Sequence, residues 1–212
     1  MRRISILVIS IILGTTAVAQ SMRNLFTAMP DSILEVMTKI NRLDCIDLIE
    51  NDRLAKVRNR FDGYSTLDSL TADYLSLQLT PSCCVEMKFF PYPDSLGCIC
   101  MARTYAGPTE ETMISFYSAD WTPLPLERLI SLPHYDDFWL VTDSVSADET
   151  ARLQHLQDMH FIKATLSPDA PDITFELQPG EAASDELPAY ERALHPLTYI
   201  WDSSKFVRKT SH

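Results

Sequence analysis

Residues 74–90 of this 212-residue chain, YLSLQLTPSCCVEMKFF, decide the fold. Apolar residues alternate with polar ones from Leu75 to Leu79, a break follows at 80–82, and the alternation resumes at Val85. An apolar residue at every second position is typical of a strand with one buried face. Because the break is short, we expect these two strands to pair as an antiparallel hairpin.

Similar segments follow along the chain, separated by turn-forming residues at 91–95 and 106–108. The further strands that we expect are 96–105, 113–117, 161–166, 173–177 and 197–207. Consecutive strands with short breaks form an antiparallel meander. Such a sheet needs one covered face, for which flanking helices are the obvious cover.

The N-terminal part of the chain is expected to be helical. Within residues 22–60, one helix is predicted to open at 30–32 and a second to be capped by Asn41. The basic stretch 53–60 is interpreted as a solvated helix face or a connector. The predicted fold class is therefore α+β, with N-terminal helices followed by an antiparallel β-meander sheet.

Two later helices are predicted at 146–159 and 186–194. The first opens with Ser146 followed three residues later by Glu149, which is the pattern of a capping box. The residues expected on its inner face are Ala151, Leu153, Leu156 and Met159.

The second half of the chain resembles the first in a looser form. Residues 197–207 echo 113–121, since in both an apolar strand runs into a polar turn and then an aromatic residue. Two related hairpin-plus-strand units, 20–125 and 126–212, would account for this echo. The alternative is a chance resemblance between amphipathic strands.

Residues 1–19 have the pattern of a signal peptide. A short basic start precedes about ten apolar residues and an A-x-A cleavage site at Ala17 and Ala19. The alternative, an uncleaved anchor, is disfavoured because ten residues span only about 15 Å as a helix. We therefore expect cleavage before Gln20, a mature domain over 20–212, and export to the periplasm rather than to the cell surface or the medium.

The composition limits the classes of partner. The chain carries 29 acidic and 18 basic residues, which gives a net charge of −11. Such a chain repels phosphate backbones, so we expect no nucleic-acid partner. No later apolar run approaches the length that spans a membrane.

Five cysteines fall within the expected mature domain, and an odd number leaves at least one thiol unpaired or paired with another molecule. Cys98 and Cys100 would point to one face of a strand with their Cα atoms about 6.6 Å apart, at the edge of disulfide range. The cysteines are therefore interpreted as buried small hydrophobes or a single bridge, and a redox thiol pair at Cys98 and Cys100 is the alternative.

Known catalytic motifs are missing from the sequence. There is no G-x-S-x-G, no phosphate-binding glycine loop and no complete set of metal ligands, so no catalytic residue, cofactor or metal is predicted. His134 beside Asp136 and Asp137 can be drawn as an acid–base pair, but we favour a solvated surface turn, which is far more common for a histidine beside acids in such a loop.

One aromatic segment is a candidate contact patch. Tyr135, Asp136, Asp137, Phe138 and Trp139 combine aromatic and acidic side chains after a proline. If exposed, they suit a protein or carbohydrate contact, and if buried, they begin a core strand. We favour the buried interpretation.

Several motifs together resemble an exported family of unknown function from anaerobic Gram-negative bacteria. They are Phe26-x3-Pro30-Asp31-Ser32-Ile33-Leu34, Arg42-Leu43-Asp44-x2-Asp47, Leu70-Thr71-x-Asp73-Tyr74-Leu75, Glu86-Met87-Lys88, Ile99-Cys100, Gly107-Pro108 and Ile114-x-Phe116-Tyr117-x2-Asp120-Trp121. The resemblance covers most of the mature chain and implies envelope localisation, with no activity to carry over.

The leading hypothesis is a non-catalytic envelope protein that binds another protein or a surface glycan. The alternative is an envelope hydrolase whose carboxylate or His–Asp chemistry is assembled by the fold. A deep pocket with two acids, or His134 placed against Asp136 or Asp137, would favour the hydrolase, and a flat exposed aromatic patch would favour the binding protein. The identity of the partner, the oligomeric state and the pairing of cysteines are left open by the sequence.

Overall fold

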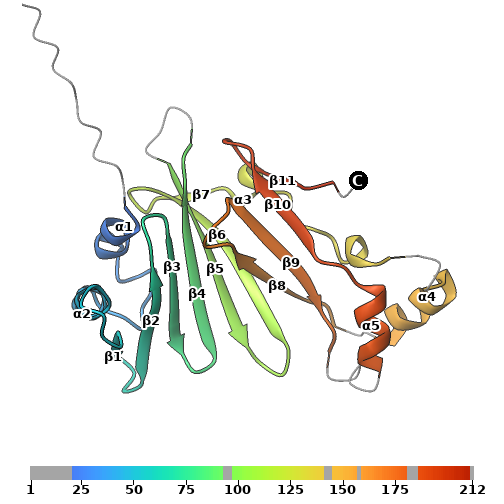
Figure 1. The fold of residues 1–212 in the computed structure, drawn as a ribbon, viewed down its shortest axis with the longest axis horizontal. Coiled ribbons are helices and arrows are strands. Elements are labelled where there is room, and N and C mark those ends of the chain that lie inside the picture. Colours follow the sequence, from blue (N-terminus) through green and yellow to red (C-terminus); the bar gives the residue numbers. More distant parts are fainter. Residues whose placement is uncertain (1–20, 93–96, 141–144, 157–158, 181–185, 211–212) are drawn as a thin grey trace, which may run out of the picture.

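The computed structural model describes residues 21–92, 97–140, 145–156, 159–180 and 186–210 (Figure 1). The predicted signal peptide, most of the turn at 91–95 and Val141 lie outside these residues. Within them, the chain forms a helical N-terminal segment followed by two antiparallel sheets. The predicted α+β class is confirmed.

The N-terminal segment contains two helices, α1 (Met22–Ala28) and α2 (Lys39–Glu50). Thr38 caps α2, and its hydroxyl and backbone N–H both bond to Asn41, which is therefore the partner of the cap rather than the cap itself. The predicted helix opening at 30–32 is wrong, because residues 31–37 form consecutive turns.

The large sheet has seven strands in the order of the chain. The strands are β1 (Lys56–Arg58), β2 (Tyr64–Leu70), β3 (Tyr74–Thr80), β4 (Cys83–Phe90), β5 (Cys98–Ala106), β6 (Glu110–Ser118) and β7 (Pro123–Leu124). All neighbours pair antiparallel, so the predicted meander is confirmed. The interpretation of residues 53–60 as a helix face or connector is wrong, because β1 lies within them.

The small sheet has the strand order β11-β10-β9-β8. Its strands are β8 (Phe161–Leu166), β9 (Asp172–Gln178), β10 (Leu197–Trp201) and β11 (Phe206–Arg208). The segments around them contain the helices α3 (Leu126–Leu129), α4 (Ala147–Leu156) and α5 (Leu187–Ala193) and the 3-10 turn η1 (Tyr135–Phe138).

The inner face of α4 differs from the prediction. Leu153 is fully buried, as expected, and Thr150 is buried beside it. Ala151 and Leu156 are exposed instead, and Met159, which is also exposed, lies beyond the bounds of α4. This helix therefore contributes a narrower apolar stripe than its sequence indicates.

The molecule has three layers, because the large sheet is covered on both faces. Alternate residues of β3 and β4, such as Leu77 and Val85, pack with α1 and α2 in one core. Residues of the opposite face, including Phe90 and Phe116, pack against the small sheet in a second core. The period-two pattern of each strand thus supplies both cores from one sheet.

Side chains of the large sheet hold the edge strand β8. The Glu86 carboxylate accepts the backbone N–H of Leu166 at 3.1 Å, and the Thr112 hydroxyl accepts that of Ala164 at 2.9 Å. The buried Lys88 ammonium donates to the Pro168 carbonyl at 2.9 Å. Side chains on the face of the large sheet therefore make the hydrogen bonds that a neighbouring strand would otherwise make to β8.

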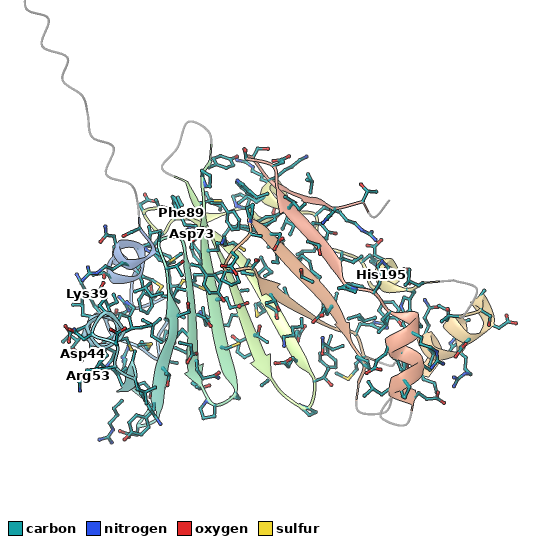
Figure 2. The ribbon with its side chains drawn as sticks, in the orientation of Figure 1. Lys39, Asp44, Arg53, Asp73, Phe89 and His195 are labelled. Carbon is teal, nitrogen blue, oxygen red and sulfur yellow. The ribbon has the colours of Figure 1, made fainter. Side chains whose placement is uncertain are left out.

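Gly97 opens β5 in a conformation that requires glycine. Its φ is 102°, and a Cβ added there would lie 2.2 Å from the ring of Phe89 and 2.8 Å from the Phe90 carbonyl oxygen. Phe89 and Asp73 are labelled in Figure 2, and the Phe89 N–H donates to the Asp73 carbonyl at 2.8 Å. The end of β4 is thereby fixed against β3.

Candidate functional site

The helical layer does not cover the whole of its sheet face. Helix α2 contacts β1 and β2, and in Figure 1 both N-terminal helices lie on that side of the large sheet. Ile99 and Met101 of β5 are buried in the helix-side core. Further along this face, Tyr105 is 42% exposed and Met113 on the neighbouring strand is 63% exposed. The uncovered part of β5 and β6 thus exposes two large apolar side chains to solvent.

A hollow of about 530 Å³ lies on this part of the sheet. We call it the β5–β6 groove, and its lining residues are Pro30, Ser32, Ile33, Arg103, Tyr105, Met113, Ile114, Ser115, Tyr117, Trp121 and Pro123. Residues of the turn after α1 form one wall, and the strand faces form the floor. Ligand sites commonly combine such an apolar, aromatic lining with a few polar groups.

Arg103 joins the floor of the groove to its wall. Its Nη2 donates to the Ile33 carbonyl at 2.7 Å, which attaches the turn after α1 to β5. Its Nε is buried and has no hydrogen-bond partner among the described residues. Leaving a buried N–H without a partner has a free-energy cost. Of the polar contacts that position the Arg103 guanidinium, the bond to the Ile33 carbonyl is the one that reaches the turn after α1.

Trp121 closes one end of the groove in a strained conformation. Its φ is 66°, which a bulky residue rarely adopts. The Trp121 indole N–H donates to the Leu25 carbonyl at 3.0 Å, and its ring lies 5.6 Å from that of Tyr117. Backbone strain of this kind costs about 1–3 kcal/mol and is concentrated at functional sites.

The groove is long in the direction of the strands. Tyr105 pairs with Glu111 across the β5–β6 ladder, six residues along β6 from Tyr117. At about 3.3 Å per residue, Tyr105 and Tyr117 are separated by about 20 Å along the strand. Such dimensions suit an extended chain better than a compact small molecule.

A second, smaller hollow of about 250 Å³ lies between the end of β9 and α5. Glu176, Glu191 and His195 are among its lining residues, and Figure 2 shows His195 where β10 meets α5. The Nδ1 atom of His195 lies 2.9 Å from the Phe138 carbonyl oxygen. Among the described residues, no hydrogen bond or ion pair joins His195 to either carboxylate, so the hollow holds no assembled acid–base pair.

The residues of the predicted contact patch are divided between core and surface. Phe138 is fully buried, and Tyr135 and Trp139 are half-buried with ring centroids 5.7 Å apart. Asp136 is exposed, and Asp137 forms an ion pair with Arg208 at 3.1 Å. The segment is a 3-10 turn followed by an isolated bridge from Trp139 to Leu194, just after α5, rather than the start of a strand.

His134 and its acidic neighbours form a cap. The Asp137 carboxylate accepts the His134 backbone N–H at 2.7 Å, and that bond, followed by Arg208, lowers the pKa of Asp137. The His134 imidazole lies 3.2 Å from Asp136, with both side chains more than 70% exposed. His134, Asp136 and Asp137 therefore form the solvent-exposed N-terminal cap of η1.

Cys98 and Cys100 point to the same face of β5, toward the small sheet, and both are buried. Neither forms a disulfide. Burial raises the pKa of Cys98 to about 12 and that of Cys100 well above its ordinary value. A redox thiol requires an accessible sulfur of low pKa, so this environment favours the interpretation of both as small hydrophobes.

Two properties of the described part of the chain bear on binding partners. No group of three or more histidine, cysteine, aspartate or glutamate side chains gathers there in a way that suits a metal ion. None of the helices in those residues has both the length and the apolar character needed to cross a membrane.

Sequence reasoning did not identify Arg103, Tyr105 or Tyr117 as site residues. The alternation of Met113, Ser115 and Tyr117 already placed these side chains on one face of a strand. The sequence did not show which face of that strand the helices leave exposed. That depends on where α1 and α2 end.

The fold and the groove together define a three-layer α+β protein with a groove on a partly uncovered sheet face. The chain belongs to the family described as "Protein of unknown function (DUF3256)", whose model matches residues 15–206. The predicted resemblance to a family of unknown function is thereby confirmed.

A solved structure of a domain of an uncharacterized protein from Porphyromonas gingivalis W83 has the same fold, with a TM-score of 0.74 and 26% sequence identity. The similarity covers 92% of this chain and 100% of that one. No curated protein matches the chain.

Proposed function

We propose that this protein is a non-catalytic, exported binding protein of the cell envelope whose β5–β6 groove holds a glycan chain. The observation that carries the proposal is a partly uncovered aromatic face: the exposed Tyr105 and the half-buried Tyr117 lie about 20 Å apart along the strands, and Arg103 lies between them. The strained backbone of Trp121 at one end supports it.

The position of the groove favours a glycan over a peptide. A peptide in extended form gains most from a sheet edge, where unpaired backbone groups extend the ladder. The groove instead lies on a sheet face, where the backbone groups of β5 and β6 already pair with each other and with β4. A ligand there must bind to side chains alone, and aromatic rings suit the apolar faces of sugars.

The polar side chains of the groove match the hydroxyl groups of a sugar. Arg103 offers several N–H donors in a fixed plane, and its anchoring to the Ile33 carbonyl leaves its orientation preorganised. The hydroxyls of Ser32 and Ser115 both donate and accept hydrogen bonds. Preorganised donors lower the entropic cost of holding a flexible chain.

A glycan array probed with the purified mature protein, followed by calorimetry on the best ligand, tests the proposal. We expect Tyr105→Ala to weaken binding about tenfold, since an aromatic side chain that anchors a ligand contributes more than 1 kcal/mol. The matched control is Tyr64→Ala, because Tyr64 is 57% exposed and lies on β2, away from the groove. Circular dichroism of both variants checks that they fold.

Two results would count against a glycan ligand. The first is the absence of saturable binding to any glycan of the array while the protein is folded. The second is binding that Tyr105→Ala and Tyr64→Ala leave equally unchanged. In-cell crosslinking to a single envelope protein, lost with Tyr105→Ala, would instead favour a protein ligand for the same groove.

A further inference from the structure

Among the residues that the structure describes, β11 has a neighbouring strand on one side only, so the small sheet ends there in an open edge. In the β10–β11 ladder, the Lys209 N–H donates to the Thr198 carbonyl at 2.8 Å and the Asp202 N–H donates to Lys205 at 2.9 Å. Because antiparallel pairs alternate, Val207 also faces β10, whereas the backbone groups of the residues on either side of it point outward. Unpaired backbone groups of this kind are ready to pair with another chain.

A cleft of about 390 Å³ lies beside this edge. Its lining residues are Glu127, Arg128, Ile130, Ser131, Leu132, Asp137, Tyr199, Lys205, Phe206, Val207 and Arg208. They come from β11 on one side and from α3 and the segment after it on the other, and Figure 1 shows α3 near the β10–β11 hairpin. Ile130 and His134 both have extended backbone angles, so the facing segment runs as an open chain.

The cleft combines an apolar base with a basic rim. Ile130 and Phe206 are buried, with exposures of 2% and 3%. Arg128, Lys205 and Arg208 contribute three cations, against the two carboxylates of Glu127 and Asp137. Arg208 is already paired with Asp137, and the lining carries a net charge of +1, which is opposite in sign to the −11 of the whole chain. The local field therefore favours an anionic ligand.

We propose that the β11 edge and this cleft bind an extended acidic peptide segment of another protein. The outward backbone groups of Phe206 and Arg208 require a partner with its own row of N–H and C=O groups, which is a property of a peptide strand. Carboxylate side chains on alternate residues of that strand would lie on one side, within reach of Arg128 and Lys205. The site is separate from the β5–β6 groove and does not depend on it.

The probe for the test is a fluorescein-labelled octapeptide that alternates glutamate and valine, and the readout is fluorescence anisotropy. We expect saturable binding that weakens about tenfold when lysine replaces glutamate, because rim charges then repel. Two further octapeptides carry N-methyl groups on alternate residues, one in each phase. The phase that removes the N–H groups facing β11 is expected to abolish binding while leaving the protein unchanged.

The matched protein variants test the charge of the rim. Arg128→Glu together with Lys205→Glu is expected to weaken the glutamate peptide about tenfold. Lys39→Glu together with Arg53→Glu carries the same change in charge in and just after α2, where Figure 2 labels both residues, and is expected to leave binding unchanged. Tyr105→Ala is also expected to have no effect at this site.

Three outcomes would overturn the proposal. They are equal affinity for the acidic and basic peptides, full binding of both N-methylated phases, and no saturable binding at millimolar peptide. An equal loss of affinity in both double variants would also overturn it, because the effect would then follow net charge rather than the cleft. Loss of glycan binding in the groove, by contrast, has no bearing on it.

Discussion

Arg42 is the buried side chain on which the N-terminal layer depends. It is 1% exposed, its Nε donates to the Phe26 carbonyl at 2.9 Å, and its Nη2 donates to the Met29 carbonyl. Its Nη1 donates to the Met37 carbonyl at 3.1 Å and to the Asp31 carboxylate at 2.8 Å. One guanidinium thus satisfies carbonyls that the end of α1 leaves without partners.

Replacing Arg42 by leucine keeps the apolar stem but removes every one of these donors. Each buried carbonyl that loses its partner costs about 1–3 kcal/mol, and breaking a buried charge pair costs about 3–5 kcal/mol. Because the Asp31 carboxylate is half exposed and can turn to water, we expect a total loss of about 4 kcal/mol. Arg42→Lys retains the charge but not the planar fork, so about half of that loss is expected.

Urea unfolding followed by tryptophan fluorescence measures this loss, because the Trp121 indole is bonded to Leu25 in α1. The control is Arg53→Leu, an exposed arginine just after α2, for which we expect a change within about 0.5 kcal/mol. A loss below about 1 kcal/mol for Arg42→Leu would refute the reasoning. Since Ile33 lies between Met29 and Met37, whose carbonyls Arg42 binds, Arg42→Lys is also expected to weaken ligand binding in the groove.

Other expectations concern strain, thiols and pH. Gly97→Ala is expected to lower the free energy of unfolding by about 3 kcal/mol in urea titrations, since its positive φ and close contacts leave no room for a Cβ. Cys98 and Cys100, buried and with raised pKa values, should stay unlabelled by a thiol reagent at pH 8 until urea is added, and rapid labelling in the folded protein would revive the redox hypothesis. The His134 N–H bond lowers the folded pKa of Asp137 below its unfolded value, so its contribution to stability is present at neutral pH and is lost as the pH falls below about 4. Asp137→Asn should therefore flatten the decline of the urea midpoint in that acidic range, and an unchanged decline would contradict this assignment.

Alternation was sufficient to predict the centre of the large sheet but not its first strands. Leu75, Leu77 and Leu79 keep an unbroken period of two, and β3 is found where that period predicts it. In β2, a register shift between Leu67 and Ser69 interrupts the ladder, so the sequence of this strand shows no regular alternation. The three residues of β1 are too few for any period to be visible.

The N-terminal layer was harder to predict because one tertiary contact overrides local spacing. Ile33, Val36 and Met37 recur at helical intervals, yet they lie in turns. Arg42 accounts for this difference, since it binds carbonyls on both sides of that segment. The sequence around residue 30 gives no indication that the Arg42 guanidinium, twelve positions later, binds this segment.

The candidate groove exists because α1, α2 and the turn after α1 leave part of the β5–β6 sheet face uncovered. The strands that carry Arg103 and Tyr117 were predicted, but their exposure depends on the lengths of α1 and α2 and on the path of the turn after α1. For the aromatic segment at 135–139, the favoured prediction was burial, and Phe138 does lie in the core. The predicted core strand is wrong there, because residues 135–138 form a 3-10 turn.

The bonds that Glu86 and Thr112 make to β8 also bear on aggregation. An edge strand with free amides recruits other copies of its own chain, and two amides of β8 are instead occupied by side chains. This protection exists only once the large sheet has formed, because the residues that provide it belong to β4 and β6. A chain that is still folding therefore exposes β8, and substitutions at Glu86 or Thr112 should reduce soluble yield more than they reduce the stability of the finished fold.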